Sequence, residues 1–388
     1  MSERLIVRVY NVGFGDAVLV FVPDRDEAGR PVTHHILIDV GNVLAGPGSG
    51  NAVYDAIFTD VLQVLNGRRL DLYISTHEHL DHVEGPLHAA VALGKTVKAD
   101  HVWMTASAEG DAYYERHPDA KRKKLALEET FRRLRPLVAA SGSDRWRNML
   151  VNNDFEPTMT AAGRRASTRD CISHIREEMG GAVHYLYAGA PMEGAHGFRE
   201  ASFRILAPVE NTAEYYGRSR PFSLTNLEGD AAGAGTQALP PPGVDAGAFY
   251  DLVRSRGGGF PETLLAIDKA ANDTSLVVEL TWRGRRLLFV GDAELGSWKK
   301  MLASGGLQPV DFLKVGHHGS HNGTPFDDLD ALLPPREEPR QVAVSTCCGA
   351  YNGVPHGLTM EALGKRATVH DTRTVEVGKY IDVVIEVA

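Results

Sequence analysis

Residues 77 to 82, His-Glu-His-Leu-Asp-His, constrain this chain more than any other feature of its sequence. They offer three imidazoles and two carboxylates directly after a short apolar strand expected at residues 72–74. Imidazole and carboxylate are ligands that zinc, manganese and iron bind in proteins. A polar loop that holds histidines by chance is the alternative, but clustering this tight favours a metal site.

The spacing inside this motif predicts how its residues share the ions. His77 and His79 lie two positions apart in extended chain, so they point the same way and can hold one ion. If the chain then turns, Asp81 and His82 face a neighbouring ion, while the intervening Glu and Leu point away. Six residues cannot complete two metal sites, so further ligands must come from elsewhere.

The second half of the chain supplies candidates at two strand ends. Asp292 follows Val290-Gly291, and its two carboxylate oxygens can bridge two ions, although a turn aspartate after glycine is common. His317 and His318 follow the strand expected at residues 312–315. Adjacent histidines project in different directions, so only one of this pair is expected to be a ligand.

Two more residues have open roles. Asp273 begins the strand that precedes Asp292, where it serves either as a ligand or as a turn cap. His356 lies on a late loop and is expected to face the substrate.

Apolar runs separated by Gly, Pro and other turn residues predict the strands, and apolar spacing of three and four predicts the helices. Residues 229–248, rich in Gly, Ala and Pro, predict a flexible loop. Strands are expected at residues 5–9, 17–22, 35–38, 72–74, 274–282, 286–290, 312–315, 342–345 and 381–387, and helices at 53–65, 87–93 and within 111–140.

A weak internal echo relates the two ends of the chain. The strand DAVLVFV is followed by one that ends in Asp39 and Gly41, and the strand TSLVVEL is followed by one that ends in Gly291 and Asp292. Each region offers a hairpin that ends in an acid beside a glycine. The echo predicts two similar αβ halves packed together, with residues 106–264 inserted between them.

The net charge and its distribution indicate whether the chain binds nucleic acid. The chain of 388 residues has a formal net charge of -9, which does not favour non-specific binding to nucleic acid. One basic run, residues 121–124 followed by Arg132, Arg133 and Arg135, is expected to be a solvated helix face. The alternative is that these basic side chains form a surface patch that binds phosphate groups.

Cysteine usage and hydropathy bear on the compartment. The three cysteines are odd in number and include no Cys-x-x-Cys, which argues against a disulfide framework and favours a reducing compartment. No apolar run approaches the roughly 18 residues that cross a bilayer. We therefore expect a cytoplasmic protein that makes no membrane contact.

Five segments in a fixed order carry a family resemblance beside the central motif. The segments are Asn11-Val12-Gly13-Phe14-Gly15-Asp16-Ala17, Leu37-Ile38-Asp39-Val40-Gly41, Asn272-Asp273-Thr274-Ser275-Leu276, Gly291-Asp292-Ala293-Glu294 and Leu313-Lys314-Val315-Gly316-His317-His318-Gly319-Ser320. Together they resemble the metallo-β-lactamase fold superfamily, in the branch that contains the hydrolase domain of the bacterial DNA-uptake channel and the choline-phosphate esterases of teichoic acid.

The resemblance implies an α/β fold, a four-layer αββα sandwich with metals at the edge where two sheets meet. A single domain would span residues 1–388, with αβ halves at 1–105 and 265–388. The partly helical insertion, residues 106–264, would cover the site and select the substrate. Two departures stand out: Phe14 replaces a frequent glutamine, and His356 follows a proline that it usually precedes.

The resemblance also implies roles for the candidate residues. Asp273 would be a ligand of the first ion or leave that ion an open position, and His317 would be an acid or charge stabiliser that faces the substrate. The remaining ligands follow by position: His77 and His79 for the first ion, Asp81, His82 and His318 for the second, and Asp292 bridging both.

These features predict a hydrolase that binds two divalent ions. Zn²⁺ is the expected metal, and Mn²⁺ is the alternative. The ions would supply hydroxide from a shared water, with Asp81 central to catalysis and His317 or His356 aiding the leaving group. By resemblance the substrate is a phosphodiester, DNA or RNA included. The alternatives are a small ester, lactone or β-lactam, and a metal-binding regulatory module without turnover. A protein partner or a homo-oligomer is compatible with the sequence, and so is a monomer without a partner.

Replacing Asp292 tests the bridging role. The Asp292→Ala variant is expected to lose bound metal and activity together while keeping the circular dichroism spectrum of the wild-type fold. Full activity in this variant would contradict the dinuclear site.

Overall fold

A computed structural model of the chain describes residues 4–42, 51–154, 158–160, 163–215, 265, 268–335, 339–347 and 354–387. The chain divides into two units. The larger unit comprises residues 1–109, 151–210 and 271–388, and the smaller comprises residues 110–150 and 211–270. The predicted flexible loop at 229–248 lies outside the described residues.

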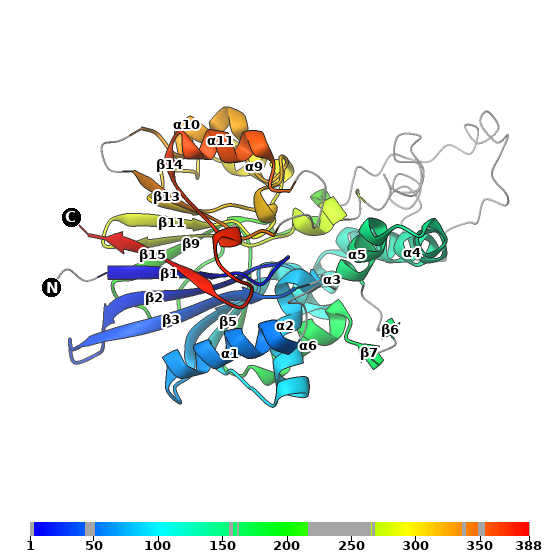
Figure 1. Cartoon of the computed structure of the whole chain (residues 1–388), viewed down its shortest axis with the longest axis horizontal. Helices are drawn as coiled ribbons and strands as arrows, with labels where there is room; N and C mark the ends of the chain where they lie inside the picture. Colours follow the sequence, from blue (N-terminus) through cyan, green and yellow to red (C-terminus); the bar gives the residue numbers. More distant parts are fainter. Residues whose placement is uncertain are drawn as a thin grey trace. The chain divides into compact units, whose positions relative to one another are not determined.

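The larger unit contains two mixed β-sheets (Figure 1). The first has seven strands in the order β15-β1-β2-β3-β4-β5-β8. Its strands are β1 (Arg4–Tyr10), β2 (Ala17–Arg25), β3 (Pro31–Val40), β4 (Leu70–Ile74), β5 (Ala99–Thr105), β8 (Ala182–Leu186) and β15 (Tyr380–Glu386).

The second sheet has six strands in the order β14-β13-β12-β11-β10-β9. Its strands are β9 (Ala201–Ala207), β10 (Val277–Trp282), β11 (Arg285–Phe289), β12 (Phe312–Lys314), β13 (Arg340–Val344) and β14 (Ala367–Asp371). A separate short hairpin pairs β6 (Thr158–Thr160) with β7 (Gly163–Arg165).

The two sheets repeat one order of pairings. In the first, β1, β2 and β3 pair antiparallel, and β4, β5 and β8 continue in parallel. In the second, β9, β10 and β11 pair antiparallel, and β12, β13 and β14 continue in parallel. The internal echo of the sequence concerned only the hairpins β2–β3 and β10–β11, and the predicted division at residues 106–264 stays a prediction. Strands β8 and β9, which lie within residues 106–264, each complete one edge.

Helices cover the outer face of each sheet, so the larger unit has the expected αββα layers (Figure 1). One buried cluster joins the first sheet to α1, α2 and α6, and another joins the second sheet to α9, α10 and α11. The helices are α1 (Asn51–Leu65), α2 (Leu80–Leu93), α3 (Asp111–Arg116), α4 (Pro118–Ser141), α5 (Asp144–Asn152), α6 (Thr168–Glu178), α9 (Leu295–Ala303), α10 (Leu329–Leu332) and α11 (Gly357–Gly364).

Helix α1 illustrates how the pattern produces the layer. Its buried residues recur at spacings of three and four, which places them on one face against the sheet. They are Val53, Tyr54, Ile57, Phe58, Val61 and Leu65. Among the described helices, none has both the length and the apolar character that crossing a bilayer requires.

The strands and helices predicted from the sequence are confirmed, with shifted ends. The main correction concerns α2, which was expected at residues 87–93 and begins at Leu80. Asp81 and His82 therefore lie in its first turn, where a carboxylate interacts favourably with the helix dipole. The apolar spacing alone missed this start because the turn is built from motif residues.

The basic run lies on α4 in the smaller unit and is partly engaged within that unit. Lys123 is buried, and its ammonium donates to the carbonyl of Ala213 at 2.9 Å. Arg133 donates to Glu129 at 2.8 Å. Lys121 and Arg122 are exposed.

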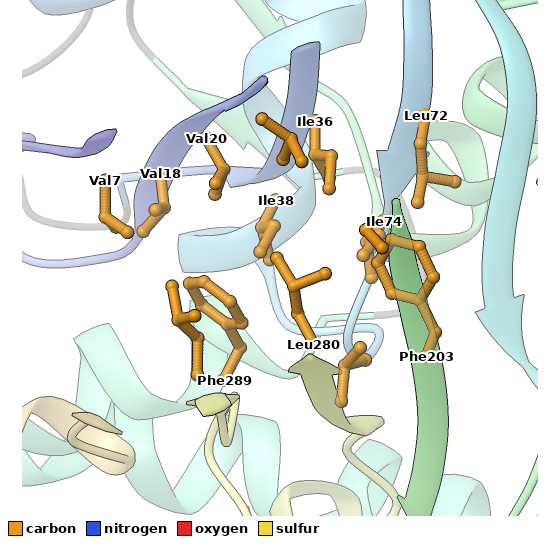
Figure 2. Packing of buried hydrophobic residues seen from close by; sticks show 14 of the residues in the cluster. Val7, Val18, Val20, Ile36, Ile38, Leu72, Ile74, Phe203, Leu280 and Phe289 are labelled. Atoms are coloured by element: carbon orange, nitrogen blue, oxygen red, sulfur yellow. The ribbon is translucent and has the colours of Figure 1, made fainter. Parts of the chain in front are cut away.

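The space between the two sheets is filled by aliphatic and aromatic side chains (Figure 2). Val18, Ile38 and Ile74 come from the first sheet, and Leu280 and Phe289 come from the second. Burying such side chains is the main favourable contribution to folding. This layer holds together the halves that share the site.

Truncating one side chain of this layer should destabilise the fold. Leu280 is 1% exposed, so Leu280→Ala is expected to lower the free energy of unfolding by about 2–5 kcal/mol. Urea denaturation followed by tryptophan fluorescence measures this change. Val91→Ala, at a position that is 78% exposed, is the control and should change it by less than about 0.5 kcal/mol.

Candidate metal centre

Four predicted ligands from both halves meet at one buried point. One ligand atom from each of Asp81, His82, Asp292 and His318 lies within 4.8 Å of the others, and all four residues are buried. We call these four residues the Asp–His cluster. Such a cluster can hold a metal ion.

Asp292 faces a different imidazole with each of its oxygens. Its Oδ1 lies 3.3 Å from Nε2 of His82, and its Oδ2 lies 3.5 Å from Nε2 of His318. Asp81 approaches the same His318 nitrogen with Oδ2 at 3.2 Å. The nitrogens and carboxylate oxygens therefore converge, as metal ligands do.

The backbone around Asp81 depends on two close approaches. The amide of Asp16 donates to the carbonyl of Asp81 at 3.0 Å, and the amide of Gly41 donates to the carbonyl of Asp16 at 3.0 Å. A Cβ on Gly15 or Gly41 would overlap the backbone of Asp81. These glycines therefore let the loops after β1 and β3 pack directly against the start of α2.

The carboxylate of Asp39 orients His82. Its Oδ2 accepts from Nδ1 of His82 at 2.8 Å and from the hydroxyl of Thr76 at 2.6 Å, and its Oδ1 accepts from the amide of Thr76 at 2.8 Å. Asp39 has a φ of 50°, a left-handed conformation that Asp tolerates better than most residues. In the sequence, Asp39 stands out only in the internal echo and in a matched segment, with no role toward His82 expected.

Hydrogen-bond partners place the hydrogen on Nδ1 in each of three histidines. The carboxylate of Asp39 and the carbonyl of Ser345 only accept, so Nδ1 of His82 and Nδ1 of His318 both carry hydrogen. The Thr76 hydroxyl already donates to Asp39, so it accepts from Nδ1 of His77 at 3.1 Å. Each ring therefore presents Nε2 as its potential ligand atom.

Several polar atoms at this point lack a partner in the described part of the chain. Nε2 of His77, Nε2 of His82 and Oδ1 of Asp81 are buried and make no hydrogen bond there. Unsatisfied buried polar atoms are costly, and a divalent cation would satisfy nitrogen and oxygen donors of this type. The residues present therefore fit a metal ion.

His79 lies close to His77, with 4.7 Å between the ring centroids. Its Nε2 lies 2.8 Å from Oδ1 of Asn153, an oxygen that only accepts. Nδ1 is consequently the His79 nitrogen that is left for an ion. Its role as a ligand of the first ion stays a prediction.

The buried charges shift the pKa values of the cluster. Burial disfavours the charged imidazole, but the carboxylates of Asp292 and Asp81 outweigh burial and raise the pKa of His82 well above its ordinary value. The same balance raises the pKa of His318. Burial and the neighbouring His82 lower the pKa of His77. Protons and cations therefore compete for Nε2 of His82 and of His318, so metal affinity should rise with pH.

Asp273 has a different environment from the Asp–His cluster. Its Oδ1 accepts from the amide and the hydroxyl of Ser297, both at 3.2 Å, near the start of α9. The Asp273 carboxylate therefore accepts from the first turn of α9, which differs from the local turn cap expected as the alternative. A ligand role for Asp273 stays a prediction.

His317 lies on the same turn as His318, η5 (His317–Gly319), whereas His356 is the N-cap residue of α11. Nδ1 of His317 lies 3.5 Å from Oε1 of the buried Glu294, and the His317 side chain is 20% exposed. The amide of His356 donates to the carbonyl of Gly319 at 2.8 Å. Of the two adjacent histidines on η5, only His318 belongs to the Asp–His cluster. The two side chains therefore project in different directions.

A buried ion pair beneath the cluster was not anticipated. The ammonium of Lys314 donates to both oxygens of Asp16, at 2.8 and 2.7 Å, and both side chains are nearly inaccessible. Oδ1 of Asp16 lies 3.9 Å from Nδ1 of His318. The pair ties β12 of the second sheet to the loop before β2 of the first. Both residues lie in matched segments, but no local pattern pairs them.

Comparison with protein-family models finds no match, and comparison with curated proteins finds none. Among solved structures, the fold is similar to CmlA, a diiron beta-hydroxylase from Streptomyces venezuelae, at 13% sequence identity and a TM-score of 0.36. The match covers 100% of this chain and 55% of that one, so this chain spans about half the length of CmlA. A likeness this distant says nothing about the activity of the chain.

Removing the Asp39 carboxylate should weaken metal binding. Asn tolerates the left-handed backbone at this position, so Asp39→Asn is expected to fold but to hold His82 less firmly. Changes to such supporting residues typically lower metal affinity about 10–100-fold. Competition with a chromophoric chelator measures this affinity.

Asp382→Asn is the matched control, because Asp382 pairs with Arg8 on strands outside the cluster. Wild-type affinity in Asp39→Asn would show that Asp39 does not orient a ligand.

Proposed function

We propose that this chain is a metal-dependent hydrolase whose substrate is a phosphodiester. The observation that carries the proposal is the Asp–His cluster, in which imidazole nitrogens and carboxylate oxygens from both halves converge out of water. The resemblance of the sequence motifs to the metallo-β-lactamase superfamily supports hydrolysis as the reaction.

The proposed metal site has two parts. His77 and His79 would hold a first ion, and the Asp–His cluster would hold a second, with Asp292 between them. Both oxygens of Asp292 face imidazoles of the Asp–His cluster, His82 and His318, and the bridge to the first ion rests on the resemblance. When bound, two divalent ions acidify water and stabilise negative charge on substrate oxygens.

The residues around the site would position the substrate and move a proton. The amide of His317 donates to Oδ1 of Asp292 at 3.1 Å, which holds this residue beside the cluster. Its partly exposed ring is suited to donate a proton to the leaving oxygen or to stabilise charge on the substrate. The backbone contact between His356 and Gly319 supports a role for His356 toward the same substrate.

The phosphodiester assignment rests on the resemblance. The exposed Lys121 and Arg122 support a phosphate-rich substrate, while the net charge of -9 opposes non-specific binding to DNA or RNA. We therefore favour a substrate recognised at the metal site over one held by general electrostatic attraction.

Turnover by the purified protein tests the proposal. With Zn²⁺ or Mn²⁺ added, the wild-type chain is expected to hydrolyse bis-(p-nitrophenyl) phosphate, and Asp81→Ala is expected to lose at least about 100-fold in rate, because it removes a ligand outright. Plasmid DNA, RNA, cyclic dinucleotides and a β-lactam reporter, assayed in parallel, identify the substrate class.

Asp144→Ala is the matched control, since its carboxylate is 84% exposed in a surface ion pair. Equal activity in wild type and Asp81→Ala would indicate a contaminating nuclease and contradict the proposal. Hydrolysis of the β-lactam reporter alone would favour the small-ester alternative. Bound metal without any turnover would favour the regulatory module.

A further inference from the structure

Two adjacent asparagines outside every recognised motif contact the histidine-rich motif directly. Asn152 ends helix α5, and Asn153 follows it. Oδ1 of Asn152 accepts from the amide of Asp81 at 3.0 Å, and Oδ1 of Asn153 lies 2.8 Å from Nε2 of His79. Asn152 is buried.

The bond from Asn153 determines which atom of His79 can bind an ion. A neutral imidazole carries one N–H, and the amide oxygen of Asn153 accepts it at Nε2. The lone pair is therefore on Nδ1, and the ring cannot turn over without losing this bond. Neighbouring His77 presents Nε2, so the two histidines use different ring atoms.

The bond from Asn152 supports the start of helix α2. The first amides of a helix have no partner within the helix. His79 occupies the N-cap position of α2 and makes no side-chain capping bond. Asn152 supplies an acceptor for one of these amides, that of Asp81, from a distant part of the sequence. The bond holds in place the backbone that carries the Asp81 carboxylate.

Both asparagines belong to the larger unit, and hydrogen bonds of the following residues hold them there. The amide of Asp154 donates to the carbonyl of Val151 at 3.1 Å, and the amide of Thr168 donates to the carbonyl of Asp154 at 2.9 Å. Thr168 begins helix α6, which a capping box at Ser167 and Asp170 stabilises. Helix α6 packs with α2 in one buried cluster. The pair is therefore held by the scaffold that carries the motif.

We infer that Asn152 and Asn153 are positioning residues for the metal centre, Asn153 acting through His79 and Asn152 through Asp81. The inference rests on the metal site of the proposed function. It extends that site to a stretch of chain, within residues 106–264, that the sequence placed in a substrate-selecting insertion.

Metal affinity measured without substrate tests this inference. Asn153→Leu keeps the approximate size of the side chain and removes the acceptor, so Zn²⁺ affinity in a chelator competition should fall about 10–100-fold. Asn153→Asp keeps an acceptor for Nε2 and should restore most of the affinity. Asn152→Leu should lower affinity as well, through Asp81.

The chain offers a matched control. Oδ1 of Asn51 lies 2.6 Å from Nε2 of His88, the same pairing at an exposed place outside the site. Asn51→Leu should therefore leave Zn²⁺ affinity unchanged. If Asn153→Leu fails to fold by circular dichroism, Asn153→Ala replaces it as the variant without an acceptor.

The outcomes separate this inference from the proposed function. Wild-type Zn²⁺ affinity in folded Asn153→Leu and Asn152→Leu, or an equal loss in Asn51→Leu, would overturn the inference and leave the metal site standing. Failure of wild type to bind Zn²⁺ would overturn both. Zinc binding without any hydrolysis would overturn only the proposed reaction.

Discussion

The packing of buried carboxylates against buried imidazoles at the junction of two sheets is the interaction on which the larger unit depends. Asp81 and His82 come from one half, and Asp292 and His318 come from the other. Charged groups removed from water need partners, since an unpaired buried charge costs several kcal/mol. The two halves therefore satisfy each other at this point, and neither half alone could keep its charges buried.

Layers of supporting bonds keep these ligands in place. Asp39, Ser345 and Thr76 each bond to the ring nitrogen that points away from the centre. Beneath them, the ammonium of Lys314 compensates the carboxylate of Asp16. The two adjacent positive φ values of His317 and His318 show that the turn is held in an unfavourable conformation. Such strain persists where surrounding contacts over-determine it, as in functional sites.

Sequence patterns predicted much of this structure because strand ends and motif spacing are local properties. The hairpin of β10 and β11, the strand before the motif and the convergence of Asp292 with His82 all follow from residues near one another or from matched segments. The pairing of Asp16 with Lys314 could not be predicted, since 298 positions separate them. Nor could the contact of Asn153 with His79, since 74 positions separate them and no matched segment contains Asn153.

The pairing of β15 with β1 has a consequence for synthesis (Figure 1). The outer edge of strand β1 stays open until residues 380–386 are made. An open strand edge is a template for pairing with other chains, and contacts between such distant residues form slowly. One sheet therefore stays unfinished while all the residues between β1 and β15 are synthesised. The vulnerability of the nascent chain to aggregation should depend on elongation rate and on chaperones that cover that edge.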